Sequence, residues 1–428
     1  MFNKRICLVA LGIMAATQAV ASEQSDSKGF VADSSLNVLL RNAYINRDYK
    51  NTPQTDSDSA EWGQAAIGTF SSGFTQGTVG VGVDAFGLYA LRLDGGSGRS
   101  GNGGIDFFKQ DSNGNAARDL SRMGGAIKFR VSNTVLKYGD MMPALPLLQY
   151  DDSRLLPESF TGTMITSKEI KGLEINAGHF TEEARKSATG RDSGGLKQID
   201  VLGGSYTFND RLKGSLYGMD VKDVYKQQYL GLTYVHPLSS QQSLTLDFNG
   251  YRTDIDKSFA TDVLKSGDSN RIWSLGATFT TGAHSFTLAH QRSSGSAGYP
   301  YGGYQNGGGI GNGGSSIYLA NSYWSDFNAE DERSWQLGYG LDFTTFGMPG
   351  LTYKFAYVRG DNIRTAEGDA EEREIFNQVQ YVVQSGAAKD LKLRARSSIL
   401  RVSDKANASY MRSGNELRLF VEYPISVF

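Results

Sequence analysis

The chain has few cysteines and few prolines, and each shortage excludes a class of structure. Its one cysteine, Cys7, lies near the start of the 428 residues, so a disulfide framework and thiol catalysis are excluded for the rest. The 8 prolines suit a protein in which most strands must donate backbone hydrogen bonds. Beyond residue 21 no segment reaches the roughly 18 consecutive apolar residues of a transmembrane helix, so an inner-membrane helical protein is also excluded.

Net charge and catalytic motifs are lacking as well. The formal net charge of −2 gives no support for a nucleic-acid partner. The 4 histidines are scattered, and neither an HExxH nor a GxSxG motif is present, so no zinc or serine hydrolase is indicated. We therefore expect a protein that is not an enzyme and that carries no metal and no cofactor.

The first 21 residues have the features of a secretory signal peptide. Two cations precede an apolar run from Ile6 to Ala16, and Ala19-Val20-Ala21 forms an A-x-A cleavage site. The prediction is a cleaved signal over residues 1–21, followed by a single exported domain over residues 22–428.

Alternation of apolar and polar residues recurs along this domain and predicts an all-β protein. The abundance of glycine, with 52 residues, and of phenylalanine and tyrosine, with 22 each, suits glycine turns and aromatic girdles. The expected strands number about 18, an even number that suits a closed barrel. They lie near residues 36–47, 62–74, 78–93, 124–131, 135–140, 161–168, 173–182, 197–207, 212–222, 226–235, 243–253, 271–280, 285–292, 333–343, 351–359, 373–384, 391–401 and 414–428.

The lengths of the connections favour a barrel in a membrane. Short turns such as Asn209-Asp210-Arg211 alternate with long loops such as 94–123 and 293–332. Short periplasmic turns and long outer loops are typical of outer-membrane barrels. The prediction is therefore a closed antiparallel transmembrane β-barrel in a bacterial outer membrane, in contact with its lipid.

The alternation also predicts which side chains face the lumen, because the apolar set of each strand must face lipid. In the strand near 391–401, Leu391 and Leu393 face outward, whereas Arg394 and Arg396 face inward. The same phase applied to the other strands gives a set of inward cations: Arg41, Arg47, Lys128, Arg130, Lys354, Arg394, Arg396 and Arg418.

These cations favour a pore that guides anions. Positive charge in a narrow lumen concentrates anions, and a guanidinium group can bind a carboxylate with two hydrogen bonds. The alternative is that the charges only hydrate a generic pore and pair with inward acids such as Asp84. Both interpretations are open at this point.

The loop at 141–160 is unusually apolar for an outer loop, with a run from Ala144 to Leu148. Such a segment needs burial, so we expect it to fold into the barrel and narrow the pore, the alternative being a loop across the mouth. Candidate constriction residues in this loop are Tyr150, Asp151, Asp152, Ser153 and Arg154.

Several motifs resemble those of the OprD-type outer-membrane carboxylate channels of pseudomonads. They include Gly73-Phe74-Thr75-Gln76-Gly77, Gly82-Val83-Asp84-Ala85-Phe86-Gly87, Ala177-Gly178-His179-Phe180-Thr181-Glu182, Ser325-Asp326-Phe327-Asn328 and Tyr381-Val382-Val383-Gln384-Ser385-Gly386. The resemblance covers the whole exported domain. It implies an 18-stranded barrel, as a monomer or weak homotrimer, with a basic ladder that includes Arg394, Arg396 and Arg418. It also implies an acidic pore residue at Asp326, with Trp324 in a position where the family can have tyrosine.

The substrate prediction rests on this resemblance. The segments Lys137–Pro143 and Leu148–Pro157 resemble the branch of the family that takes aromatic carboxylates such as benzoate and vanillate. Passive uptake of a small aromatic acid is therefore expected. A basic-amino-acid channel of the same family and a plugged structural or adhesive barrel are the alternatives. Whether loop 293–332 enters the pore is left open, and Pro424 departs from the alternation of a plain barrel end.

Overall fold

The computed structural model describes residues 22–50, 58–94, 105–110, 115–191, 195–300, 304, 317–407 and 411–428. The predicted signal peptide at 1–21 lies outside the described residues. No helix in these ranges is long and apolar enough to cross a membrane.

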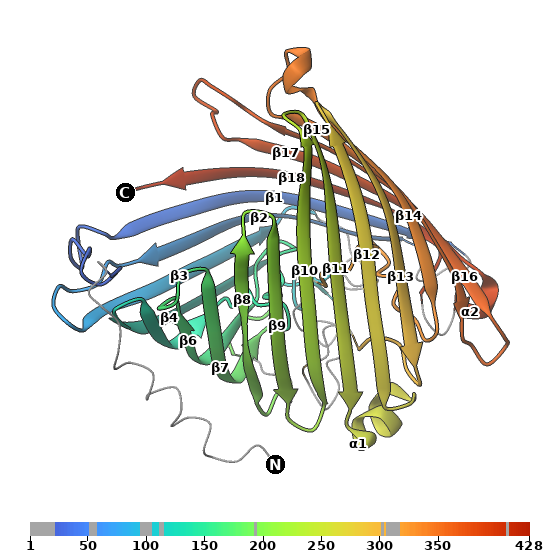
Figure 1. The fold of residues 1–428 in the computed structure, drawn as a ribbon, viewed down its shortest axis with the longest axis horizontal. Helices are drawn as coiled ribbons and strands as arrows, with labels where there is room; N and C mark the ends of the chain where they lie inside the picture. Colours follow the sequence, from blue (N-terminus) through green and yellow to red (C-terminus); the bar gives the residue numbers. More distant parts are fainter. Residues whose placement is uncertain are drawn as a thin grey trace.

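The chain folds into a single antiparallel sheet of 18 strands that closes on itself, as predicted (Figure 1). Each strand pairs with its neighbours in sequence, and β1 pairs with β18 to close the ring. The strands are β1 (Ser35–Tyr49), β2 (Asp58–Ser71), β3 (Gly80–Arg92), β4 (Asp119–Val131), β5 (Thr134–Met141), β6 (Ser159–Ser167), β7 (Leu173–Ala184), β8 (Ile199–Asn209), β9 (Leu212–Val221), β10 (Tyr225–Ser239), β11 (Gln242–Ile255), β12 (Ser269–Thr281), β13 (His284–Gly295), β14 (Arg333–Asp342), β15 (Leu351–Ile363), β16 (Ala370–Val382), β17 (Lys392–Val402) and β18 (Gly414–Ser426).

The predicted inward and outward phases follow from the burial of successive residues. On β18 the outward Leu417, Leu419 and Val421 are 39 to 41% exposed, whereas the intervening Arg418 and Phe420 are buried. Period-2 burial of this kind means that one face of the strand meets lipid and the other meets the packed lumen.

Several strand bounds differ from the predictions by a few residues, as in β4, which begins at Asp119 rather than residue 124. The ends of β2 and β18 are the most informative. β2 ends at Ser71 rather than residue 74. Beyond this point the backbone bonds to the N-terminal segment, since the Gly73 N–H donates to Phe30 O at 2.8 Å. β18 runs through Pro424, which pairs with Leu39 of β1. The Val427 N–H donates to β1, so the nitrogen of Pro424 faces the other side, where β17 has already ended. The proline therefore removes no ladder hydrogen bond.

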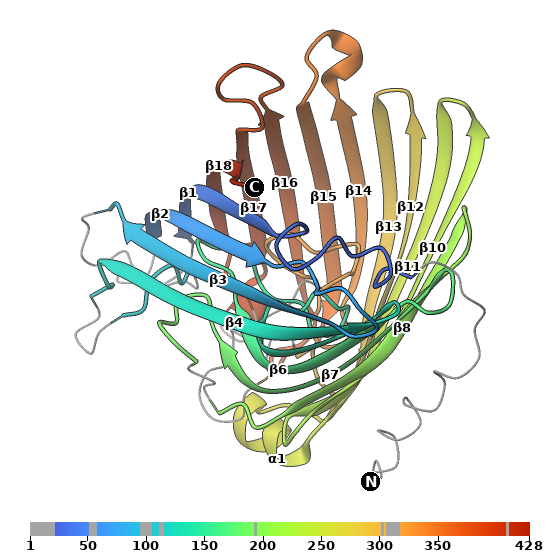
Figure 2. The same ribbon diagram turned by 90° about the vertical axis from the view of Figure 1, so that its left-hand side faces the viewer.

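The short turns and both ends of the described chain lie at one rim, and the long loops lie at the other (Figure 2). The long-loop end also carries the short helices α1 (Lys257–Phe259), η2 (Ala260–Leu264) and α2 (Asp404–Asn407), whereas η3 (Phe343–Phe346) lies in a turn at the opposite rim. Asp256 caps α1 by accepting hydrogen bonds from the Ser258 and Phe259 N–H groups.

The loop between β5 and β6, residues 142–158, folds into the barrel as predicted; we call it the first inner loop. Leu147 and Leu148 pack on the wall formed by β6–β12, whereas Leu155 and Leu156 pack with Phe107 against β1–β3. The loop therefore crosses the lumen and buries apolar residues at both ends. Residues 317–332 between β13 and β14, the second inner loop, also turn inward, since the amide of the inward-facing Gln291 donates to Phe327 O at 2.9 Å.

Candidate functional site

One inner wall, formed by β17, β18 and β1, carries a lattice of charged side chains. The register places Lys392, Glu422 and Arg41 side by side, and Arg394 beside Phe420. Arg396 stands beside Arg418, and Glu416 lies beside Arg47. Because directly opposite residues face the same side of a sheet, all of these groups share the lumen.

Two arginines of this wall share a single buried carboxylate. Arg47 Nε lies 2.8 Å from Glu416 Oε2, and Arg418 Nε lies 2.6 Å from Glu416 Oε1. The Arg47 guanidinium also lies 5.6 Å from the centre of the Trp324 ring. Glu416 thus fixes both guanidinium groups in position and neutralises part of their charge.

Arg41 attaches the first inner loop to the wall. Its guanidinium donates two hydrogen bonds to Asp152, at 2.7 and 3.0 Å, and one to Glu422 at 2.8 Å. A further bond reaches the carbonyl of Arg154 at 3.0 Å. The bidentate contact holds Asp152 in one orientation. Arg41 and Asp152, which were predicted as a ladder residue and a constriction residue, therefore form one structural link.

Arg394 and Arg396 differ from these three arginines. Within the described residues no carboxylate lies within ion-pairing distance of either guanidinium. Arg394 instead lies over the Phe420 ring at 4.6 Å, and Arg396 lies over the Phe376 ring at 4.9 Å. The Nε atoms of both arginines lack a hydrogen-bond partner within the part of the chain described. Both guanidinium groups lie on the lumen side of the wall, and each has a buried Nε–H donor without a partner among the described residues.

The other predicted cations lie nearer the short-turn rim. Lys128 on β4 binds Asp84 at 2.6 Å, in agreement with the alternative that some inward cations pair with Asp84. Arg130 lies over the Phe74 ring at 4.2 Å and donates to Gln24. Lys354 on β15 is exposed to the lumen. With the wall of β17–β1, these residues extend the basic arc from β15 round to β4.

The predicted constriction residues of the first inner loop are tied into ion pairs and turns. Asp151 pairs with Lys186 at 2.5 Å. Burial alone would raise the pKa of Asp151, but the charges of Lys186 and Arg154 outweigh it and hold that pKa well below its usual range. The Ser153 N–H donates to Asp151 at 2.7 Å, and Tyr150 lies beside Asp152 in a recess at the short-turn side of the loop.

Arg154 adds a further cation beside the basic wall. Its Nε donates to Ile105 O at 2.8 Å, which ties the first inner loop to the segment between β3 and β4. Burial, and then the neighbouring guanidinium groups of Arg418 and Arg47, lower the pKa of Arg154 to about 10. The group remains charged at neutral pH and adds to the positive field of the wall.

The second inner loop brings Trp324 and Asp326 to the same region. The N–H groups of Trp324 and Ser325 donate to the Glu374 carboxylate of β16, at 3.1 and 2.9 Å. Asp326 accepts a hydrogen bond from the Ser322 hydroxyl and lies within electrostatic range of Arg418. Burial raises the pKa of Asp326 to about 6, although these two contacts oppose the rise. Asp326 thus supplies an acid whose charge changes near neutral pH.

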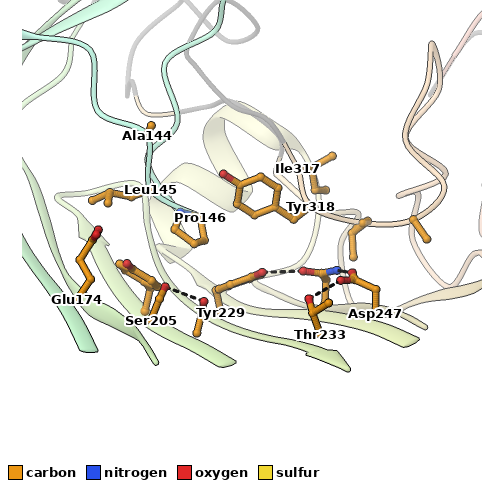
Figure 3. A pocket seen from close by; sticks show the side chains of 15 residues that line it. Ala144, Leu145, Pro146, Glu174, Ser205, Tyr229, Thr233, Asp247, Ile317 and Tyr318 are labelled. Atoms are coloured by element: carbon orange, nitrogen blue, oxygen red, sulfur yellow. Dashed lines mark hydrogen bonds between the residues drawn. The ribbon is translucent and has the colours of Figure 1, made fainter. Parts of the chain in front are cut away.

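The opposite wall is formed by β7–β11 and differs in chemistry. A recess with a volume of about 670 Å³ lies between this wall and the two inner loops (Figure 3). Tyr229 donates to Asn249 at 2.6 Å, and Thr233 donates to Asp247 at 2.7 Å. Pro146 and Tyr318 of the inner loops face these groups (Figure 3). Hydroxyls and acids therefore oppose the arginines across the lumen.

A barrel of 18 strands with inward loops and one basic wall has the architecture of a substrate-selective porin. Residues 28–427 match the family model described as outer membrane porin, OprD family. The chain belongs to this family. It is 43% identical to Porin D of Pseudomonas aeruginosa, over 96% of this chain and 95% of that protein.

Solved structures of similar proteins support the same assignment. The crystal structure of OccAB1 from Acinetobacter baumannii has a TM-score of 0.88 at 39% identity, over 95% of this chain and 100% of that one. OpdK of Pseudomonas aeruginosa, crystallised with vanillate, has a TM-score of 0.81 at 31% identity, over 93% and 100%. This OprD-family protein is accordingly an outer-membrane porin for small molecules and not an enzyme.

Three residues that shape the porin lumen were not singled out from the sequence. Glu416 and Glu422 neutralise the arginines, and they share the inward phase of Arg418 on the same strand, so the alternation could have identified them. Arg122 of β4 donates to the carbonyls of Pro157 and, at 2.6 Å, Arg185. This last contact depends on how two loops meet, for which the sequence carries no signal.

Proposed function

We propose that the porin takes up small carboxylates passively and that Arg394 and Arg396 bind the carboxylate in transit. The observation that carries the proposal is the absence, in the described part of the chain, of any carboxylate paired with either guanidinium. A solute carboxylate can supply the missing partner through charge-assisted hydrogen bonds. Arg41, Arg47 and Arg418 are engaged with protein acids and act mainly by holding the wall and loop in place.

We propose aromatic acids as the preferred class. Phe420 and Phe376 are buried beneath the two unpaired arginines, so the guanidinium planes are the surfaces on which a flat aromatic ring can stack. A site of this kind binds weakly, as a channel requires for release. In this proposal the narrowest part of the path is bordered by Tyr150, Asp152, Ser153, Arg154, Trp324 and Asp326. The basic arc is extended toward the periplasm by Lys128, Arg130 and Lys354.

The acids of the first inner loop support a carboxylate over a basic amino acid. A basic amino acid would need an anionic partner for its side-chain cation. Asp151 and Asp152 are neutralised by Lys186 and Arg41, so neither is free for this role. Asp326, with its pKa raised to about 6 by burial, is only weakly suited to hold a cation in acidic media.

One observation favours the second candidate, a solute with both a carboxylate and a cation. Asp247 on the opposite wall has hydrogen-bonding partners in Thr233 and Asn249 but no cation partner among the described residues. Such a solute could extend across the lumen from the arginines to Asp247.

Competition in proteoliposomes tests the choice. We expect uptake of labelled benzoate to be inhibited by unlabelled benzoate or vanillate and much less by arginine at the same concentration. Asp247→Asn is the matched variant, because it leaves the arginines intact. Equal inhibition by arginine that is lost in Asp247→Asn would select the second candidate. Benzoate uptake that is unchanged in Arg394→Ala and Arg396→Ala would contradict both.

A further inference from the structure

The outer surface of the barrel carries a belt of arginines on one side. Every strand from β11 to β17 has an outward-facing arginine near the end that carries the long loops, beginning with Arg252 on β11 and ending with Arg401 on β17. In an outer-membrane porin this end is extracellular. We call this set the arginine belt.

The arginine belt lies at the level of the outer lipid headgroups. Arg292 is directly opposite Trp273, and Arg359 is directly opposite Trp335. Trp335 is 55% exposed on the barrel surface, and tryptophans of this kind mark the boundary between hydrocarbon and headgroups. The guanidinium groups are therefore in reach of headgroup phosphates rather than of bulk water alone.

The register places these arginines against one another. Arg252 is directly opposite Arg271, and Arg292 is directly opposite Arg333. Arg373 stands between Arg359 and Arg401 and is directly opposite both. Like charges at directly opposite positions destabilise a sheet. A row that repeats this arrangement on strand after strand indicates an anion that bridges the neighbours.

Protein acids neutralise only part of the belt. Arg333 pairs with Asp361 at 2.8 Å, and Arg359 pairs with Glu371 at 2.9 Å. Within the described ranges Arg271, Arg292 and Arg373 have no carboxylate within ion-pairing distance, and all three are exposed. These three positions have charge and hydrogen-bond donors to offer to a ligand.

On the other side of the barrel, acids and lysines at the same end balance one another. Asp200 on β8 is directly opposite Asp220 on β9, and both face outward. The cations near them are already paired, since Lys226 lies 2.7 Å from Asp220 and Lys197 lies 2.5 Å from Asp223. The belt is therefore a local feature of β11–β17 and not a general property of the rim.

We propose that the arginine belt binds the phosphate groups of the glycolipid that forms the outer leaflet of the outer membrane. A phosphate between two directly opposite arginines accepts hydrogen bonds from both guanidinium groups, and it relieves their repulsion. The acyl chains of the same lipid then pack on the apolar surface beneath the tryptophans. The side formed by β8–β10, where acids and lysines pair with one another, takes no such lipid.

Purified diphosphorylated lipid A is the probe, titrated into the folded porin in neutral detergent with EDTA. Lipid binding is measured by native mass spectrometry. The triple variant Arg271→Gln, Arg292→Gln and Arg373→Gln should bind lipid A at least about tenfold more weakly, because each substitution removes charge-assisted hydrogen bonds. The control variant Lys50→Gln, Lys197→Gln and Lys226→Gln changes the net charge equally and should stay within about twofold of the wild type.

Three results would overturn the proposal: wild-type affinity in the triple variant, equal affinity for dephosphorylated lipid A, or binding by the wild type that occurs only in a parallel titration without EDTA. The last result would assign the lipid to divalent cations bridged by Asp361 and Glu371. Unchanged single-channel conductance in a phospholipid bilayer confirms that the triple variant is folded. Should it fail to fold, Arg373→Gln alone is the decisive variant, because Arg373 has two directly opposite arginines and should show the largest single loss of lipid A.

Discussion

The arginines of the inner basic wall fall into two groups that lie on neighbouring strands but have different partners. Arg41, Arg47 and Arg418 bind buried carboxylates, whereas Arg394 and Arg396 lie on phenyl rings with no carboxylate beside them. Glutamates lie directly opposite Arg41 and Arg47, and Glu416 lies two residues from Arg418 on its own strand. Phe420 lies directly opposite Arg394, and Phe376 lies diagonally across from Arg396. An inward arginine therefore holds the structure together or is a candidate solute contact according to whether a carboxylate lies next to it in the sheet.

Deleting the part of the first inner loop that Arg41 holds should have the largest effect on the channel. Deletion of residues 144–152 takes out the apolar run and Asp152, so the first inner loop can no longer cross the lumen. We expect single-channel conductance in a planar bilayer to rise severalfold. Conductance at the wild-type level would place the narrowest point outside this loop.

Replacing Arg41, which links the first inner loop to the wall, should lower the stability of the barrel. Arg41→Ala leaves Asp152 and the buried Glu422 without their guanidinium partner. Leaving a buried charge without any partner costs about 3 kcal/mol. Glu422 keeps Lys392 at 2.6 Å and Asp152 is partly exposed, so the unfolding midpoint should fall by less than this cost implies, and the open channel should become noisier. Thermal melts and bilayer recordings measure the two effects. Arg41→Lys keeps the charge but loses the bidentate contact. It should recover part of the stability, but its open channel should remain nearly as noisy as that of Arg41→Ala.

Loss of an unpaired arginine should have the converse effect, since it should reduce uptake more than stability. Arg396→Ala removes a cation that no protein acid needs, so the barrel should keep its melting temperature within a few degrees while benzoate uptake falls about tenfold. Proteoliposome uptake and a thermal melt of the same preparation separate the two effects. If Arg396→Ala destabilised the barrel as much as Arg41→Ala, the distinction between the two groups would fail.

The smallest predicted effect is a change of ion selectivity with pH. Burial raises the pKa of Asp326 to about 6, so this carboxyl is neutral at pH 5 and ionised at pH 7.5. Ionisation adds a negative charge near Arg418, and the preference for anions should therefore decrease as pH rises through 6. Reversal potentials in a KCl gradient measure the preference. Asp326→Asn should remove the change between these two pH values.

The fold was predictable from the sequence because the strands repeat one rule. Apolar residues face lipid at every second position, as in Leu417, Leu419 and Val421, and this fixed both the number of strands and the inward phase of Arg418. The inward folding of the first inner loop was predictable because a run such as Ala144–Leu148 needs burial.

The pairing within the candidate site was not predictable to the same degree. Which arginine meets which acid depends on the register between β1, β17 and β18, and alternation within one strand does not specify register. The tie between Arg41 and Asp152 further requires the path of a loop through the lumen. The inward or outward orientation of a side chain is a local property of its strand, whereas these contacts join residues that are far apart in the chain.

The closure of the ring by β1 and β18 also constrains how the porin is made. Ser35–Tyr49 and Gly414–Ser426 are the first and last strands of the sheet in chain order, and each is a hydrogen-bonding partner of the other. Until the last strand arrives, the sheet has two open edges, and open edges are not tolerated in the hydrocarbon layer. The final strand therefore acts as a check on completeness: a chain cut short at any earlier point has no means of sealing itself into the membrane.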